Sequence, residues 1–187
     1  MKSKKYILMV AGTALLVLLG TAGSNTGKGQ QKLGGAWIGS GGQQVWTSFQ
    51  TPLDSAGMTA ALRVNYVAWD SGSAALISLL GGDTMTEFSG SQEMISRDTA
   101  KSWMIGYFTK AGNPPLICAI AVFKGTTTYV GPNDIVVEGD LDFYPGPANA
   151  LGLSNADANG DGFPDPRTAP WLSVHFGPVT AKRAVSP

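Results

Sequence analysis

The sequence predicts an all-β protein, an antiparallel meander of eight to ten strands. Three observations predict this class: almost no segment has helical period, charged residues make up only 14% of the chain, and 25 glycines are available for tight turns between short strands. Because so many consecutive antiparallel strands must hide their edges, we expect them to close into a barrel, in preference to stacking as a β-sandwich.

The first expected strands form a hairpin with glycine at its bend. GAWIG at 35–39 and VWTSFQ at 45–50 flank the turn SGGQ. A turn at 51–57 precedes a strand at 59–69, which mixes β-branched, aromatic and polar residues. Segment 74–80 is short and flanked by glycines, so it fits a helical turn or a strand equally well.

The later strands are read from alternation and from apolar runs. KSWMIGYFTK has a period of two, and LICAIAVFKG is too uniformly apolar to be half exposed. The strands expected after the ambiguous segment are 84–90, 91–97, 101–110, 116–125, 126–131, 134–146 and 171–179.

The ends of the chain flank this domain. Residues 1–23 have a basic start, a short apolar run and a small-residue exit, which predicts a secretory signal peptide. The alternative is an uncleaved anchor, but the apolar run is shorter than the ~20 residues that a spanning helix needs. We expect a flexible lead-in at 24–32, a single all-β domain at 33–179 and a tail at 180–187. The expected location is secreted or periplasmic, with no stable membrane span after cleavage.

Charge and cysteine content limit the partners. Removing residues 1–23 takes away three lysines and no acid, which leaves 10 basic and 13 acidic residues. Such a mildly acidic chain is a poor partner for nucleic acid, which needs a basic surface. The lone cysteine, Cys118, lies inside an apolar run, so we expect it to be buried and inert.

LGGAWIG at 33–39 resembles the glycine–any–tryptophan signature on the first strand of lipocalins and related calycin barrels, matched here by Gly35 and Trp37. The resemblance implies a closed barrel in which this tryptophan packs across one end. It covers only this motif and the all-β meander. The chain lacks the later turn motif of the family, and a disulfide is impossible with one cysteine.

Catalytic motifs are sparse. His175 is the only histidine, and the sequence has no G-x-S-x-G elbow, phosphate-binding loop or dinucleotide fingerprint. Glu138, Asp140 and Asp142 lie on one face of one strand, so they are candidates for acid–base chemistry or simply a solvated face. The five tryptophans are expected mainly in the core, with some at a ligand-binding barrel mouth.

The stretch DANGDGFPD at 157–165 predicts a calcium site. Oxygen-bearing residues stand at positions one, three, five and nine, and glycine stands at six, where a calcium loop bends sharply. The expected ligands are Asp157, Asn159, Asp161, the carbonyl of Phe163, and Asp165. The pattern resembles the loops of EF-hands and dockerins, and most closely the short repeats of thrombospondin type 3.

The loop also departs from an EF-hand. Position twelve is Thr168 instead of a bidentate glutamate, and Pro164 and Pro166 stiffen the exit. A loop of this kind is expected to bind Ca²⁺ as a structural clamp. The alternative is a metal-free turn, since Asp, Asn and Gly favour turns.

These observations lead to two functional hypotheses. The first is an exported, calcium-stabilised β protein that acts as a binding or structural module, with a small apolar molecule in the barrel lumen or an extracellular partner as its ligand. The alternative is a secreted hydrolase that uses the strand carboxylates Glu138, Asp140 and Asp142, which would have to converge in a cleft with an acid from another strand.

Overall fold

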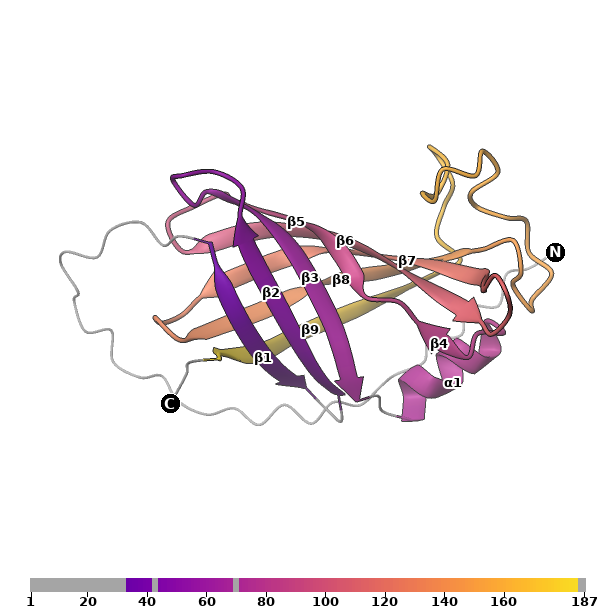
Figure 1. Ribbon diagram of the computed structural model, residues 1–187, viewed down its shortest axis with the longest axis horizontal. Helices are drawn as coiled ribbons and strands as arrows, with labels where there is room; N and C mark the ends of the chain where they lie inside the picture. Colours follow the sequence, from indigo (N-terminus) through magenta and orange to yellow (C-terminus); the bar gives the residue numbers. More distant parts are fainter. Residues whose placement is uncertain (1–32, 42–43, 69–70, 185–187) are drawn as a thin grey trace.

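The computed structural model describes residues 33–41, 44–68 and 71–184 (Figure 1). The expected signal peptide and lead-in lie outside the described residues. The elements in chain order are β1 (Gly35–Gly41), β2 (Gln44–Pro52), β3 (Thr59–Ala68), α1 (Ser71–Leu79), β4 (Thr84–Met85), β5 (Phe88–Met94), β6 (Thr99–Lys110), β7 (Leu116–Tyr129), β8 (Asp134–Pro145) and β9 (Leu172–Arg183).

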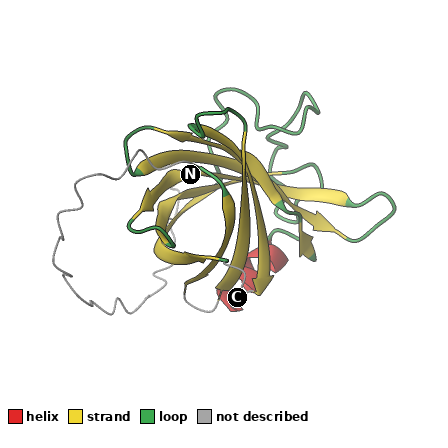
Figure 2. Ribbon diagram, turned by 60° about the vertical axis from the view of Figure 1, so that its left-hand side comes forward, coloured by secondary structure: helices red, strands yellow, loops and turns green. Residues whose placement is uncertain are grey.

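Eight of these strands form a closed antiparallel barrel, which confirms the predicted fold class. The ring runs β1, β2, β3, β5, β6, β7, β8 and β9, each strand pairing with the next, and β9 pairs with β1 to close it. The short β4 is an extra strand that pairs with the end of β6. Figure 2 looks obliquely into this ring. The architecture is compatible with a calycin-like barrel.

The segment that fitted either a helix or a strand is helical. Helix α1 ends in a glycine cap: Gly81 has φ +84°, its N–H donates to Ser78, and the N–H of Gly82 donates to Ile77. This pair of hydrogen bonds satisfies carbonyls at the helix end, and a positive φ favours glycine. Ile77 and Leu80 are buried in the hydrophobic core, so packing against the barrel stabilises this short helix.

The closing strand extends further than the sequence indicated. β9 continues to Arg183, so residues 180–183 belong to the barrel and not to the expected tail; residues 185–187 lie outside the described part of the chain. The polar composition of this end suggested a tail, but Arg183 pairs with Trp37 of β1 and places its guanidinium 4.8 Å from the centre of the indole ring. A cation over an aromatic face is attracted by the ring quadrupole.

Trp37 packs near the end of the barrel where β1 begins and β9 ends. Its side chain is completely buried, and Tyr129 meets it edge to face with ring centroids 5.8 Å apart. The Tyr129 hydroxyl donates to Oε1 of Gln50 at 3.0 Å, and burial raises the pKa of Tyr129 to about 12. Aromatic packing and a buried hydrogen bond therefore hold β1, β2, β7 and β9 together.

Strand β7 is buried on both faces, as its uniform apolarity predicted. Ala119, Ala121 and Phe123 belong to the interior core, whereas Ile120 and Val122 belong to a second cluster on the outer wall. The second cluster is completed by Ala156, Ile105 and Tyr144, and Ala156 comes from the long β8–β9 connection. Cys118 is also fully buried as expected, and burial raises the pKa of its thiol.

The β2–β3 turn yields a prediction about acid stability. The hydroxyl of Thr59 and the N–H groups of Met58 and Thr59 donate to the Asp54 carboxylate, and these bonds lower its pKa from 3.8 to about 2. A depressed pKa contributes stability above pH 3.8 that is lost as pH falls through about 2.

We therefore expect Asp54→Asn to be less stable than the wild type at pH 5 and above, with the difference shrinking toward pH 2, because the wild-type carboxylate becomes neutral there. Urea midpoints measured across this pH range test the expectation. A stability difference that does not change with pH would contradict it.

Candidate functional site

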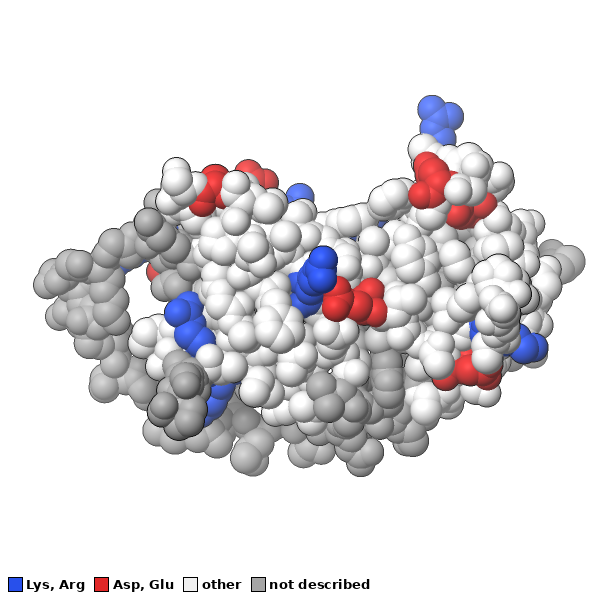
Figure 3. Space-filling view, in the orientation of Figure 1, with Lys and Arg blue, Asp and Glu red and all other residues white. Residues whose placement is uncertain are grey.

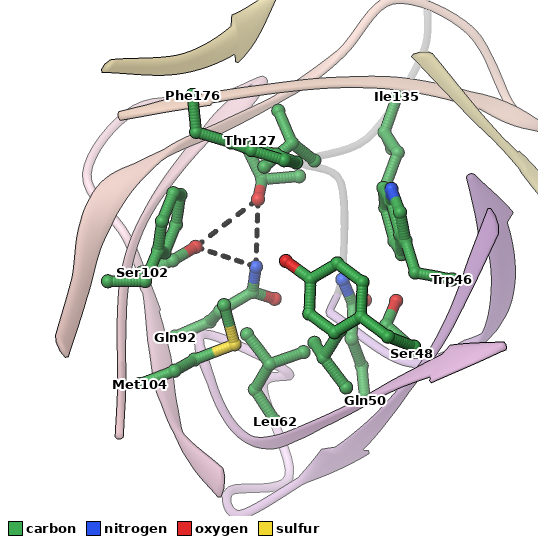
Figure 4. Close-up of a pocket in the computed structure, with 14 residues that line it drawn as sticks. Trp46, Ser48, Gln50, Leu62, Gln92, Ser102, Met104, Thr127, Ile135 and Phe176 are labelled. Atoms are coloured by element: carbon green, nitrogen blue, oxygen red, sulfur yellow. Dashed lines mark hydrogen bonds between the residues drawn. The ribbon is translucent and has the colours of Figure 1, made fainter. Parts of the chain in front are cut away.

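A cavity of about 30 Å³ lies inside the barrel. Fourteen side chains from β2, β3, β5, β6, β7, β8 and β9 line it, and none of them is Asp, Glu, His, Lys or Arg (Figure 4). A water molecule needs roughly 10–15 Å³ measured in this way. The space therefore holds one or two water molecules as it stands, and a larger guest requires side chains to move.

One wall of the cavity is a hydrogen-bonded polar group on three neighbouring strands. Gln92 of β5 donates from Nε2 to Oγ of Ser102 at 2.8 Å and to Oγ1 of Thr127 at 2.9 Å (Figure 4). The two hydroxyl oxygens lie 3.2 Å apart. The strands bring these residues together because Ser102 is the register partner of Gln92, and β7 pairs on the other side of β6. We call Gln92, Ser102 and Thr127 the polar wall.

The opposite side of the lumen also carries buried polar groups. Ser48 and Gln50 lie on the inward face of β2 and are 3% and 5% exposed. Oε1 of Gln50 accepts hydrogen bonds from the Tyr129 hydroxyl at 3.0 Å and from the Gly34 N–H at 3.2 Å. Gln50 is thus tied to the barrel end, which fixes the orientation of its amide.

Two polar atoms of the cavity lining are buried without a hydrogen-bond partner: Oε1 of Gln92 and Nε1 of Trp46. Leaving such a group unpaired costs roughly 1–3 kcal/mol. The Trp46 ring is fixed because it packs directly on Gly39 of β1, where an added Cβ would come within 2.1 Å of the ring. Gln92 Oε1 points toward the centre of the lumen (Figure 4).

The predicted calcium ligands lie on the β8–β9 connection, which packs against the outer wall and away from the lumen. Asp157 is 9% exposed and its carboxylate accepts three backbone hydrogen bonds, from Gly160 at 2.8 Å, Asp161 at 3.1 Å and Gly162 at 2.9 Å. Gly160 and Gly162 have positive φ values of 75° and 88°. The Asp157 carboxylate, at the first loop position, therefore accepts hydrogen bonds from the backbone of the bend and fixes its shape.

The other predicted ligands also bond within the loop. Oδ1 of Asn159 accepts from the Asp161 N–H at 2.9 Å, and Nδ2 of Asn159 donates to Oδ2 of Asp161 at 3.1 Å. Oδ1 of Asp161 accepts from the Phe163 N–H at 2.9 Å, and Oδ2 of Asp165 accepts from the Ala158 N–H at 2.8 Å. Within residues 33–41, 44–68 and 71–184, no three His, Cys, Asp or Glu side chains form a group that could hold a metal.

Two contacts attach this loop to the barrel. The hydroxyl of Tyr107 on β6 donates to the Gly162 carbonyl at 3.0 Å, and the rings of Phe163 and Trp103 stack with centroids 6.2 Å apart. Burial and the nearby charges of Asp157 and Asp161 raise the pKa of Tyr107. The loop conformation is therefore coupled to the outer face of β6.

The strand carboxylates point outward, as their alternation predicted, and they pair with neighbouring strands. Asp140 lies 3.1 Å from His175, and both side chains are more than half exposed. Asp142 lies 3.1 Å from Lys124 and accepts a hydrogen bond from Ser173. Burial acts to lower the pKa of Lys124, but hydrogen bonding and the charge of Asp142 raise it overall. Surface pairs of this kind contribute about 0–1 kcal/mol.

The polar contacts described for Asp140 and Asp142 are with His175, Lys124 and Ser173, on the outer face of the barrel. On the face shown in Figure 3, charged groups of the described residues are few and scattered. One of the pairs joins Arg63 to Glu87 at 3.6 Å.

The polar wall was not predicted from the sequence. Ser102 lies in phase with Ala100 and Met104, which face the core, so the alternation of β6 already placed it inside. Of the four described tryptophans, Trp37 and Trp46 are buried, Trp103 packs on the outer wall, and Trp171 is 38% exposed. Trp69 lies outside the described residues.

Searches against protein-family models, curated proteins and solved structures found no match to this chain. The class is therefore defined by the fold alone: a closed eight-stranded antiparallel barrel with a partly polar lumen. In the part of the chain that the structure describes, no helix has the length and apolar character needed to cross a membrane.

The polar wall yields a prediction about stability. Thr127→Val should lower the free energy of unfolding by about 1 kcal/mol, because it removes one acceptor for the Gln92 amide from a buried site. Thr126→Val is the matched control on the adjacent position of β7, which alternation places on the outer face, and it should change stability by less than about 0.5 kcal/mol. Chemical denaturation of both variants tests this. Equal effects would show that the inward hydroxyl is not specially bonded.

Proposed function

We propose that this protein is an exported binding module whose barrel lumen holds a small ligand and whose 157–165 loop binds one Ca²⁺ that stabilises the fold. The observation that carries the proposal is the lumen, which is incompletely filled and contains buried polar atoms without partners. Eight-stranded barrels are either filled by their side chains or hold one small ligand. Unpaired buried groups favour the second case, because a ligand would satisfy them.

The size of the lumen sets the size of the ligand. Full ligand pockets usually measure about 300–1,000 Å³, far above the cavity here. Met104 is the lining side chain best able to yield, because its unbranched thioether chain adopts many shapes at little cost. The proposed cargo is therefore a small molecule that fits the lumen once Met104 moves, with Leu62 and Phe176 as apolar walls.

The calcium proposal rests on the chemistry of the loop. Asp157, Asn159, Asp161, Asp165 and the carbonyl of Phe163 offer only oxygen donors, the ligands that Ca²⁺ prefers. The donor chemistry of these residues therefore suits the ion, but the three carboxylates do not form a metal-holding group in the described loop, so binding requires the loop to close around the ion. No Lys or Arg pairs with the buried Asp157 among the described ion pairs, so a cation would compensate a charge that is otherwise held only by amides.

Export is consistent with such a site. Extracellular calcium modules often bind on the order of 10⁻⁴–10⁻³ M, so they fill outside a cell but not inside one. The expected signal peptide at 1–23 would deliver the chain to that environment. A secreted or periplasmic location therefore belongs to the same proposal.

Calcium binding predicts a specific stability effect. Asp161→Asn keeps an acceptor for the Phe163 N–H but removes a charge from the proposed ligand set, so it should lower the melting temperature in millimolar calcium and have little effect in chelator. Asp157→Ala is a poorer probe, since it also removes three backbone hydrogen bonds. Differential scanning calorimetry with calcium or chelator makes the comparison. If calcium does not raise the melting temperature of the wild type, the loop is a metal-free turn.

A larger side chain that fills the lumen tests whether the lumen binds a ligand. Ser48→Leu adds apolar volume inside the cavity, whereas Thr47→Leu adds it on the opposite face of β2. Phenol and toluene are titrated into the ¹⁵N-labelled proteins while the indole N–H resonance of Trp46 is followed. We expect at least one compound to shift this resonance in a saturable manner in the wild type and in Thr47→Leu, but not in Ser48→Leu. The binding proposal fails if neither compound shifts it in the wild type.

A further inference from the structure

The lumen of this barrel is partly polar and carries no charged side chain. Five of its fourteen lining residues are buried polar side chains, each at most 5% exposed: Ser48, Gln50, Gln92, Ser102 and Thr127. They come from four strands that lie side by side or face one another across the barrel. A barrel that needed only to be filled would use apolar side chains here, because buried polar groups must all find partners.

Some of the polar atoms in the cavity lining have no hydrogen-bond partner within the protein. Gln50 Oε1 has two donors, and Gln92 Nε2 has two acceptors. Gln92 Oε1 has no donor, although its residue is 3% exposed, and Trp46 Nε1 has no acceptor, although its residue is 4% exposed. The cavity lining thus has one acceptor without a donor and one donor without an acceptor, and a neutral hydroxyl or amide has the donor that Gln92 Oε1 lacks.

We propose that the lumen selects small uncharged molecules that carry a hydroxyl or amide on an aromatic or aliphatic frame, with the polar group donating to Oε1 of Gln92. This inference rests on the proposed binding function and specifies its ligand class. The frame of the ligand contacts Leu62, Met104 and Phe176, which line the same cavity. Nε1 of Trp46, a second lining residue, is the other buried polar atom without a partner.

The lumen disfavours charged ligands because it has no charged side chain to pair with them. None of the fourteen lining residues can neutralise an ionised carboxylate or an ammonium group, and burying either unpaired costs several kcal/mol. Tyr66 does not change this, because burial raises its pKa to about 12 and keeps the phenol neutral. A purely apolar molecule is also disfavoured, since it would leave Gln92 Oε1 and Trp46 Nε1 unpaired.

The test compares three ring compounds of similar size: phenol, its apolar isostere toluene, and the anion benzoate. Each is titrated into the wild type and into Met104→Ala, in which the truncated side chain leaves more room for a ring. Binding is followed by the Trp46 indole resonance and by the side-chain amide of Gln92. We expect phenol to bind about tenfold more tightly than toluene, which corresponds to one good hydrogen bond, and benzoate not to bind.

The sign of this preference is diagnostic, because an apolar cavity disfavours the buried hydroxyl and prefers toluene. Gln92→Met keeps the length of the side chain but removes Oε1, so it should reverse the preference in favour of toluene. The inference is overturned if toluene binds as tightly as phenol, or if benzoate binds, in either protein. That result leaves the binding function intact, whereas the absence of any binding to the wild type removes the binding function itself.

Discussion

Antiparallel pairing of β1 with β9 closes the barrel, and the lumen, the packed end and the outer loop all depend on this seam. It is a short seam, running from Trp37 opposite Arg183 to Ser40 opposite Thr180. If it opened, β1 and β9 would expose unpaired backbone groups, and the polar wall would be hydrated. The cation–π contact between Arg183 and Trp37 and the edge-to-face contact with Tyr129 hold the seam at the barrel end.

The long β8–β9 connection packs on the outside of the barrel. β9 pairs antiparallel with β8, with Phe143 opposite Leu172, so the connection leaves β8 and enters β9 at the same end of the barrel. Between these two points Ala156 fills the cluster with Ile120 and Val122, and Phe163 stacks on Trp103. Packing therefore holds the segment at two points: the proposed calcium loop, 157–165, begins directly after the first point and contains the second.

Much of this fold could be predicted from the sequence because apolar and polar residues alternate along a strand that has one buried face. That period identified β6 and the outward carboxylates of β8, and uniform apolarity marked β7 as buried on both faces. Helix α1 was left undecided because its residues suit either state and its stability comes from Ile77 and Leu80 packing on the barrel. Arg183 was assigned to a tail because a charged residue gives no local sign of packing on an indole.

The candidate lumen site could not be predicted in the same way, and the reason is physical. A serine or glutamine on a strand normally marks the solvent face, so Gln92 and Ser102 carry no individual signal of burial. Only closure of the ring, which is set by partners distant in the sequence, places them beside Thr127 around a common centre. The loop at 157–165 differs because all its proposed donors lie within one short segment.

The buried polar groups of the lumen lower the stability of the ligand-free barrel, which is explained if the lumen serves to bind a ligand. Replacing both partners of a buried hydrogen bond by apolar groups of the same shape is often neutral or stabilising, so Gln92, Ser102 and Thr127 are not required for a stable core. Their satisfied bonds hold the Gln92 amide in one orientation, and that orientation leaves Oε1 directed at the cavity without a partner. A group fixed in place yet left unpaired is what selective recognition of a neutral polar ligand requires, because the ligand supplies the missing bond without the protein having to rearrange.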